Sequence, residues 1–165
     1  MSRAVAAKGQ LTIVSGGQTG ADRAALDFAL HAGLPHDGWC PLGRLAEDGP
    51  LAARYALRET ATDRYAERTR LNVRDSDATV VLTLTPELTG GTKLTAEIAA
   101  ELRKPLLHLC AAATGPLEAA VTLRQFIAEH SVERLNVAGP RATQEPQIGT
   151  FVDAVLTAAL GAGRE

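Results

Sequence analysis

Residues 15–23 read SGGQTGADR and lie between a short apolar run, Leu11–Val14, and a segment with helical apolar spacing that begins at Ala21. The order of strand, glycine-rich turn and helix start is typical of an anion site. Glycines let the backbone turn tightly and approach a ligand closely. The helix start offers unpaired N–H groups at the positive end of the helix dipole. The turn therefore predicts a ligand that carries phosphate or a similar oxyanion.

This turn matches neither the dinucleotide pattern GxGxxG nor the P-loop pattern GxxxxGK[ST], so we expect no NAD and no P-loop nucleotidase. The alternative is a tight connection between strand and helix that binds nothing. We expect backbone amides and the Thr19 hydroxyl to face the ligand. We expect Asp22 either to interact favourably with the helix dipole or to hold a ligand hydroxyl. The predicted ligand-binding residues here are Gly16, Gly17, Gln18, Thr19, Gly20 and Asp22.

Short apolar runs alternate with helical patterns along the chain, which favours an α/β fold with a parallel sheet covered on both faces. In such folds, ligands bind beyond the carboxyl ends of the strands. We expect strands at Leu11–Val14, His36–Cys40, Thr79–Leu84, Leu106–Leu109 and Arg134–Val137. We expect helices at Ala21–Ala32, Ala61–Asp75, Leu94–Arg103, Leu117–Glu129 and Ile148–Leu160.

A second glycine turn, residues 89–97 with the sequence TGGTKLTAE, also follows a strand and opens a helix. The two turns could hold one ligand from both sides, and we expect Gly90, Gly91, Thr92 and Lys93 to bind phosphate. Lys93 is disfavoured at a helix start by the dipole, and an anion would offset that penalty. The alternatives are a solvated lysine at Lys93 and ordinary first-turn chemistry at Glu97.

Three further segments contribute candidate residues. Arg68 and Asn72 share one helix face, and the planar guanidinium of arginine suits phosphate, although a solvated face is an equal alternative. The segment 41–60 lacks clear periodicity and is a candidate binding loop. Asn136–Arg141 ends a strand in a Gly-Pro turn and is a candidate wall of the crevice. The residues expected to lie over the ligand are Trp39, Arg44, Glu47 and Asp48.

Composition excludes several classes of protein. The 165 residues suit one domain, and a net charge of −2 gives no general attraction to nucleic acid or anionic membranes. No window is long and apolar enough to span a bilayer, and because Met1–Gln10 has no long apolar stretch we expect no signal peptide there. We interpret Cys40 and Cys110 as reduced thiols of a cytoplasmic protein, and the histidines show no ligand spacing, so we expect no protein-ligated metal.

Together these motifs resemble the family called putative molybdenum carriers. The resemblance runs from about Leu11 to Leu160 and includes SGGQTGADRAALDFAL, GWCPLGRLAEDGPL and LNVAGPR. From the length and the alternating pattern we expect a three-layer sandwich with a mainly parallel sheet of about five strands, in one domain over residues 1–165 with residues 1–10 flexible. The resemblance implies a Rossmann-like fold. It also implies a homo-oligomer, dimer or tetramer, and the molybdenum cofactor, a phosphate-bearing pterin, as cargo.

A more distant resemblance is to the "lonely guy" phosphoribohydrolases, whose pattern is PGGxGTxxE with an upstream arginine. Gly90 and Gly91 match its glycines, Glu97 its glutamate and Arg68 its arginine, whereas Lys93 replaces the third glycine. This resemblance implies catalytic roles for Arg68 and Glu97 if the chain is an enzyme.

The leading hypothesis is a cytoplasmic carrier for a phosphate-bearing ligand, with the molybdenum cofactor or a nucleotide as best candidate. The first alternative is a nucleoside monophosphate phosphoribohydrolase, in which Glu97 stabilises the positively charged sugar and steers water. The second is a nucleotide-sensing module. We expect a small phosphorylated ligand as partner, and neither nucleic acid nor membrane.

Overall fold

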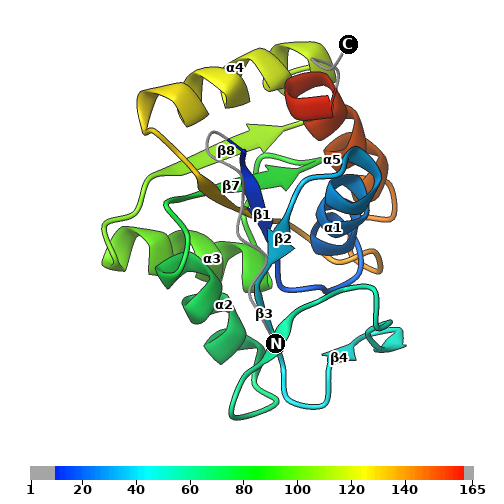
Figure 1. The fold of residues 1–165 in the computed structure, drawn as a ribbon. Helices are drawn as coiled ribbons and strands as arrows, with labels where there is room; N and C mark the ends of the chain where they lie inside the picture. The colour runs from blue at the N-terminus through cyan, green and yellow to red at the C-terminus, as the bar shows by residue number, and fades with distance from the viewer. Residues whose placement is uncertain (1–9, 162–165) are drawn as a thin grey trace.

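The computed structural model describes residues 10–161, and within them five strands form one parallel sheet in the order β2-β1-β9-β7-β8 (Figure 1). The strands are largely apolar and short, as in sheets covered on both faces. The expected flexible segment falls on residues that, except for Gln10, lie outside this range. The strands are β1 (Thr12–Val14), β2 (His36–Asp37), β7 (Ala78–Thr83), β8 (Leu106–Cys110) and β9 (Arg134–Ala138).

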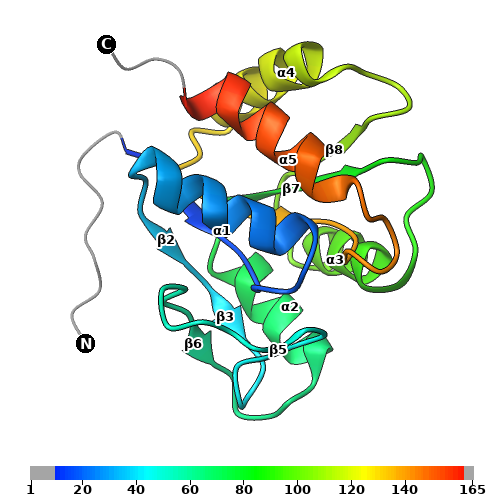
Figure 2. The same ribbon diagram turned by 90° about the vertical axis from the view of Figure 1, so that its right-hand side faces the viewer.

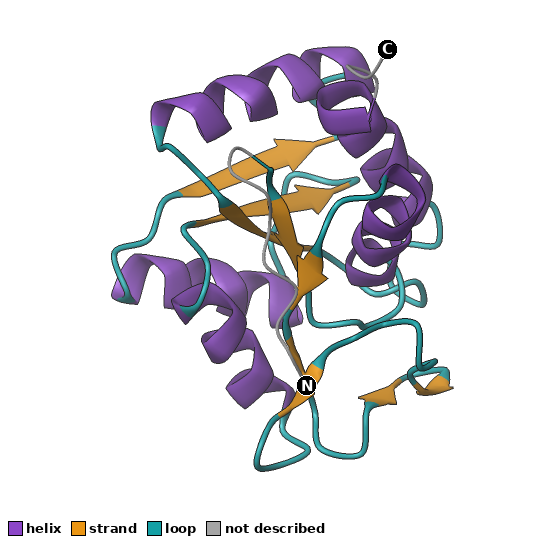
Figure 3. Cartoon of the chain, viewed as in Figure 1, coloured by secondary structure: helices purple, strands orange, loops and turns teal. Residues whose placement is uncertain are grey.

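Helices cover both faces of the sheet, which gives the expected Rossmann-like three-layer arrangement (Figures 1 and 3). One layer holds α1 (Ala21–Ala32), α4 (Pro116–Glu129) and α5 (Ile148–Leu156), which continues into the π-helix η1 (Thr157–Gly161). The other layer holds α2 (Tyr65–Arg74) and α3 (Gly90–Glu101). The first helix ends as expected, because Gly33 adopts the left-handed conformation (φ 71°) and its N–H caps Ala29.

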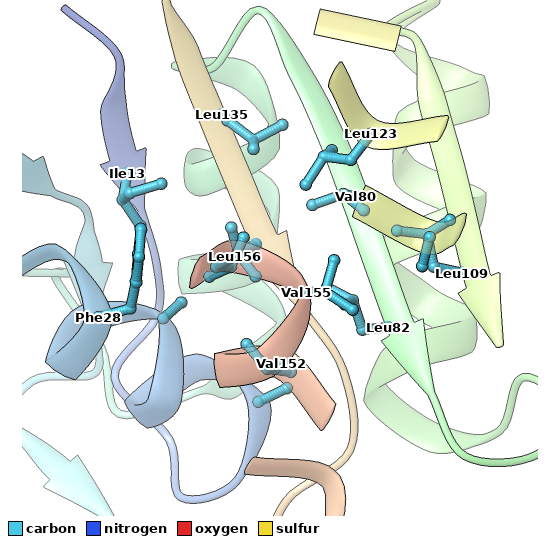
Figure 4. Close-up of a cluster of buried hydrophobic side chains, with 14 of the residues drawn as sticks. Ile13, Phe28, Val80, Leu82, Leu109, Leu123, Leu135, Val152, Val155 and Leu156 are labelled. Carbon is cyan, nitrogen blue, oxygen red and sulfur yellow. The ribbon is translucent and has the colours of Figure 1, made fainter. Parts of the chain in front are cut away.

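The larger core lies between the sheet and the layer of α1, α4 and α5 (Figure 4). Strand β7 shows how alternation builds it: Val80 and Leu82 face this core, with Leu123 and Val155 packed against the same cluster. A smaller cluster around Val73, Ile98 and Ala99 joins α2 to α3 on the opposite face.

Strand β9 lies between β1 and β7, whose following helices go to opposite faces of the sheet. The register pairs Asn136 with Thr79, and the Asn136 Nδ2 donates to Thr79 Oγ1 at 3.2 Å. In parallel sheets, ligands bind where the connections change from one face of the sheet to the other, outside the carboxyl ends of the strands. The topology therefore places the ends of β1, β9 and β7 at one edge.

Three expected elements need correction. The helix expected at Ala61–Asp75 begins only at Tyr65. The strand expected at His36–Cys40 is broken at Gly38, where a Cβ would lie 2.1 Å from the Ser15 carbonyl oxygen. The chain leaves the main sheet there, and β3 (Trp39–Cys40) pairs instead with β6 (Arg58–Glu59). The third correction is the start of α3, which begins at Gly90 and not at Leu94, because the glycine turn itself forms the first helical turn.

The segment expected as a long loop contains short strands beside the main sheet (Figure 2). Besides β6, it holds the antiparallel pair β4 (Leu45–Ala46) and β5 (Gly49–Pro50). Its apolar residues, with Leu26 of α1, form a separate small core that contains Tyr55 and Cys40. The segment is thus anchored to α1 rather than loosely attached.

Both cysteines are free and buried, and burial raises the pKa of the Cys40 thiol. Within residues 10–161, no helix has both the length and the apolar character that crossing a bilayer would require.

Candidate functional site

A pocket of about 60 Å³ lies at the carboxyl ends of β1, β9 and β7. Both glycine turns, the helix of Arg68 and the segment that begins at Asn136 contribute to its walls. The first glycine turn and α1 provide Gly16, Gln18 and Asp22; α2 provides Arg68, Thr69 and Asn72; α3 provides Gly91, Thr92 and Thr95; and the end of β9 with the loop after it provides Asn136, Val137, Ala138, Gly139, Arg141 and Gln144.

The floor of the pocket contains a buried ion pair between two helices. Arg68 Nη1 lies 3.2 Å from Asp22 Oδ2 and also donates to the Gly16 carbonyl oxygen at 3.1 Å. Burial raises the pKa of Asp22, while Arg68 and the Gln18 N–H oppose that shift. The pair fixes the guanidinium in place at the edge of the sheet.

Two buried donors at the pocket have no hydrogen-bond partner within residues 10–161. They are Nε of Arg68 and Nε2 of Gln18. The Gln18 side chain is held from its other end, because its Oε1 accepts the N–H groups of Thr19 at 3.0 Å and Glu47 at 2.8 Å. A buried donor without an acceptor costs about 1–3 kcal/mol, so both atoms mark places where an added acceptor would be stabilising.

The amides of the first glycine turn are arranged differently from the expectation. The Gln18 N–H donates to Asp22 Oδ2 at 3.3 Å, the Thr19 N–H to the Gln18 side chain, and the Gly17 N–H to Ser15 Oγ at 3.3 Å. These three N–H groups therefore stabilise the turn itself in this structure. The sequence predicted that Gln18, Thr19 and Gly20 offer backbone amides to a ligand, and two of these amides, those of Gln18 and Thr19, bond within the turn instead.

The glycines of this turn are needed because protein groups pass close to them. A Cβ at Gly16 would lie 2.1 Å from Arg68 Nη1, so only glycine leaves space for the guanidinium. Gly20 has φ +82°, and a Cβ there would lie 2.4 Å from the Pro140 carbonyl oxygen. The turn thus packs directly against Arg68 and the loop that follows β9.

The start of α3 is one part of the site with free amides. Thr89 precedes the helix without a side-chain cap, and the first N–H groups of a helix have no partner inside it. No acceptor within residues 10–161 is bonded to the N–H groups of Gly90 and Gly91. These groups and the helix dipole favour an anion.

Lys93 and Glu97 do not line this pocket. Since α3 begins at Gly90, its pocket face carries Thr92 and Thr95, and a helical turn of 3.6 residues puts Lys93 and Glu97 on the other side. Both residues are exposed. The structure therefore places Lys93 and Glu97 outside this pocket, where the sequence predicted a phosphate contact for Lys93 and a catalytic carboxylate at Glu97.

Asn72 lines the pocket, but its amide is used elsewhere. Its Oδ1 accepts the Trp39 N–H at 2.7 Å, and its Nδ2 donates to the Trp39 carbonyl oxygen at 3.0 Å. Asn72 therefore completes the backbone hydrogen bonds of the short strand β3. In the structure it therefore holds Trp39 with both polar atoms of its amide.

The four residues expected over the ligand do not line the pocket. The Trp39 indole lies under the Arg58 guanidinium and donates to Asp75 Oδ2 at 2.9 Å. Arg44 donates to four backbone carbonyl oxygens of its own segment, among them that of Tyr55 at 2.7 Å. Both residues organise the segment 41–60 internally.

Glu47 and Asp48 tie that segment to the first glycine turn. Asp48 accepts both terminal nitrogens of Arg23 at 3.0 and 3.1 Å. Glu47 accepts hydrogen bonds from the Thr19 hydroxyl and from Thr143 in the loop after β9. Segment 41–60 thus reaches the rim of the pocket through Glu47.

Sequence reasoning left Arg141 undecided, included Asn136 in a candidate wall of the crevice, and missed Thr95 and Gln144; all four residues line the pocket. Arg141 lies near the Tyr65 ring, 5.5 Å from its centroid, and Arg68 lies 5.4 Å from the same ring. Helical spacing from Thr92 could have identified Thr95, whereas Gln144 had no sequence signal. Within residues 10–161, no group of three or more His, Cys, Asp or Glu side chains could hold a metal ion.

Comparison with known proteins identifies relatives over nearly the whole chain. Residues 13–160 match the model of the circularly permutated YpsA SLOG family. A crystal structure at 1.45 Å of a "putative molybdenum carrier protein" from Syntrophus aciditrophicus SB is 42% identical, with a TM-score of 0.90, and the match covers 92% of this chain and 95% of that chain. No curated protein matches the sequence. These matches confirm the predicted fold and the resemblance to the molybdenum carriers.

Proposed function

Since the chain belongs to the circularly permutated YpsA SLOG family, we propose that it binds and carries a small ligand through a phosphate or similar oxyanion. The molybdenum cofactor is the best candidate for the cargo, because the similar crystal structure is described as a molybdenum carrier. A nucleotide is the second candidate, since it offers the same phosphate end.

The observation that carries this proposal is the pair of buried donors without acceptors, Arg68 Nε and Gln18 Nε2. Both belong to pocket-lining residues, and both can only donate. A ligand that relieves both must therefore present acceptors, as phosphate oxygens do. Contact with these deeply placed atoms requires a small shift of side chains, since neither atom is exposed.

The charges around the pocket support an anion as well. Arg68 and Arg141 both line it, and the start of α3 adds the positive end of a helix dipole. Asp22 is the one carboxylate among the lining residues, and it already pairs with Arg68. Charge-assisted hydrogen bonds contribute about 1.5–3 kcal/mol each, so a few of them would support binding near 1 μM, about −8 kcal/mol.

The size of the pocket supports binding of the phosphate end alone inside it. A volume of about 60 Å³ is far below the roughly 300–1,000 Å³ of a site that encloses a whole drug-sized ligand. The phosphate end fits inside, and a pterin or base would lie outside. The partly exposed Tyr65 ring, next to both arginines, offers an aromatic surface there.

Hydrolysis of an N-glycosidic bond receives less support than binding. Its proposed mechanism placed Glu97 against the sugar, and Glu97 does not line the pocket. Asp22 cannot simply replace it, because its carboxylate is paired with Arg68 and bonded to the Gln18 N–H. The geometry therefore favours a binding protein over a phosphoribohydrolase.

Isothermal titration calorimetry with adenosine 5′-monophosphate and with molybdenum cofactor, the latter under anaerobic conditions, tests the proposal. We expect low-micromolar binding of at least one ligand and a loss of about 100-fold in Arg68→Gln. Arg70→Gln is the matched control, since Arg70 lies on the same helix but is exposed and pairs with Glu101. Absence of heat with both ligands, or equal loss in both variants, would contradict the proposal.

A further inference from the structure

The Glu47 carboxylate is surrounded by donors from two loops at the edge of the site. The Thr19 hydroxyl donates to Oε1, the Thr143 hydroxyl donates to Oε2 at 2.8 Å, and the Thr143 N–H lies 3.4 Å from Oε1. Arg141 Nη1 lies 3.8 Å from Oε2, and the Glu47 side chain is only 17% exposed. This is the donor set of an oxyanion subsite, filled by a carboxylate of the chain itself.

This carboxylate lies beside the phosphate pocket. The Glu47 N–H donates to Gln18 Oε1 at 2.8 Å, and Gln18 lines the pocket. Arg141 connects the two places, because it lines the pocket and also pairs with Glu47. Hydrogen bonds from Thr19 and Thr143 lower the pKa of Glu47, so the side chain stays ionised at neutral pH.

We infer that Glu47 makes the site selective for ligands that end in a single phosphate group and disfavours those that carry a diphosphate. The inference rests on the proposed phosphate pocket. A second phosphate that turns toward Arg141 meets a carboxylate of the same charge. It also finds the Thr19 hydroxyl and both Thr143 donors already in use.

A single phosphate avoids this conflict because it needs only the pocket groups, namely Arg68, Gln18 and the start of α3. Like charges placed side by side in a site strongly disfavour the wrong ligand, and we expect at least about tenfold weaker binding of the diphosphate. A diphosphate whose second phosphate group points elsewhere would lose the contact with Arg141, the second arginine of the pocket.

Calorimetric titrations with adenosine 5′-monophosphate and adenosine 5′-diphosphate test this in the wild type, Glu47→Gln and Asp48→Asn. We expect the wild type to prefer the monophosphate, and Glu47→Gln to reduce the ratio to about threefold or less, mainly by tighter binding of the diphosphate. Asp48→Asn removes the same charge from the next residue, but Asp48 pairs with Arg23. It should keep the wild-type ratio.

Thermal unfolding shows whether each variant is folded. If Glu47→Gln does not fold, Glu47→Ser replaces it, and we expect the same reduced ratio of affinities. Equal affinity of the wild type for the two nucleotides would overturn the inference alone and leave the phosphate pocket intact. So would equal changes of the ratio in Glu47→Gln and Asp48→Asn, which would indicate general electrostatics. Failure of both nucleotides to bind would overturn the inference together with the nucleotide form of the proposed function.

Discussion

Arg68 of α2 reaches Asp22 of α1, with Nη1 3.2 Å from Oδ2, although the two residues are 46 positions apart in the sequence. The two helices cover opposite faces of the sheet, so this ion pair joins the outer layers at the sheet edge. The same guanidinium contributes the unpartnered Nε to the pocket. One side chain therefore connects the layers and lines the pocket.

Removal of the Arg68 charge should cost stability as well as binding. In Arg68→Met, Asp22 is left buried without its partner, and we expect a loss of about 3–5 kcal/mol in the free energy of unfolding. The double variant Arg68→Met/Asp22→Asn should lose less than the sum of the single variants, by about 1–3 kcal/mol. Urea unfolding of the four proteins measures this coupling, and strict additivity would show that the pair does not act as a unit.

Gly16→Ala should displace the Arg68 side chain. The new Cβ would lie 2.1 Å from Nη1 and 2.8 Å from Cδ, so the guanidinium must move. We expect a loss of about 1–3 kcal/mol in stability, together with weaker phosphate binding. Gly91→Ala is the stability control, because nothing lies within 4 Å of its Cβ position and alanine favours a helix. If calorimetric unfolding gave equal effects for both, the close approach at Gly16 would not matter.

Asn72→Leu should affect stability more than ligand affinity. The variant leaves both backbone groups of Trp39 without their amide partner, and we expect a loss of about 2–3 kcal/mol. Affinity for adenosine 5′-monophosphate should change less than about threefold, since the amide is not free for the ligand. A large drop in affinity with unchanged stability would assign Asn72 to the ligand after all.

Asp75 should contribute to acid denaturation. The Arg74 guanidinium, with the Trp39 indole N–H and the nearby Arg58, lowers the pKa of Asp75 from 3.8 to about 2. A lowered pKa gives stability that is present above pH ~4 and is lost as the pH falls toward 2, by up to about 2 kcal/mol. Asp75→Asn should flatten the stability profile in that window, whereas the exposed Asp63→Asn should not. Parallel profiles for wild type and Asp75→Asn would contradict this assignment.

The fold was largely predictable because its signals are local. Apolar runs gave the strands of the main sheet within one or two residues, and α1 begins and ends as expected at Ala21 and Ala32. The exception at Gly38 depends on the Ser15 carbonyl oxygen, a contact between distant residues that no local pattern carries. The start of α3 was predicted at Leu94, C-terminal to its true position at Gly90, because Gly90 and Gly91 have low helix propensity.

The site was predictable by region but not by atom. Both glycine turns and Arg68 lie at one pocket as the strand order implies. The roles within it depend on tertiary contacts: the first turn's amides are used internally, and the Asn72 amide is bonded to Trp39. The helical rotation that places Lys93 and Glu97 away from the pocket could be worked out only once the first residue of the helix was known.

The central claim, that phosphate enters this pocket between Arg68 and the start of α3, is tested most directly by ¹⁵N NMR. In a titration with adenosine 5′-monophosphate, the Arg68 Nε–H signal, the Gln18 side-chain amide and the backbone N–H signals of Gly90 and Gly91 should shift together along one binding curve. The exposed Arg70 Nε–H should stay unchanged. Shifts confined to exposed arginines, or an unmoved Arg68 signal at saturating ligand, would contradict the account.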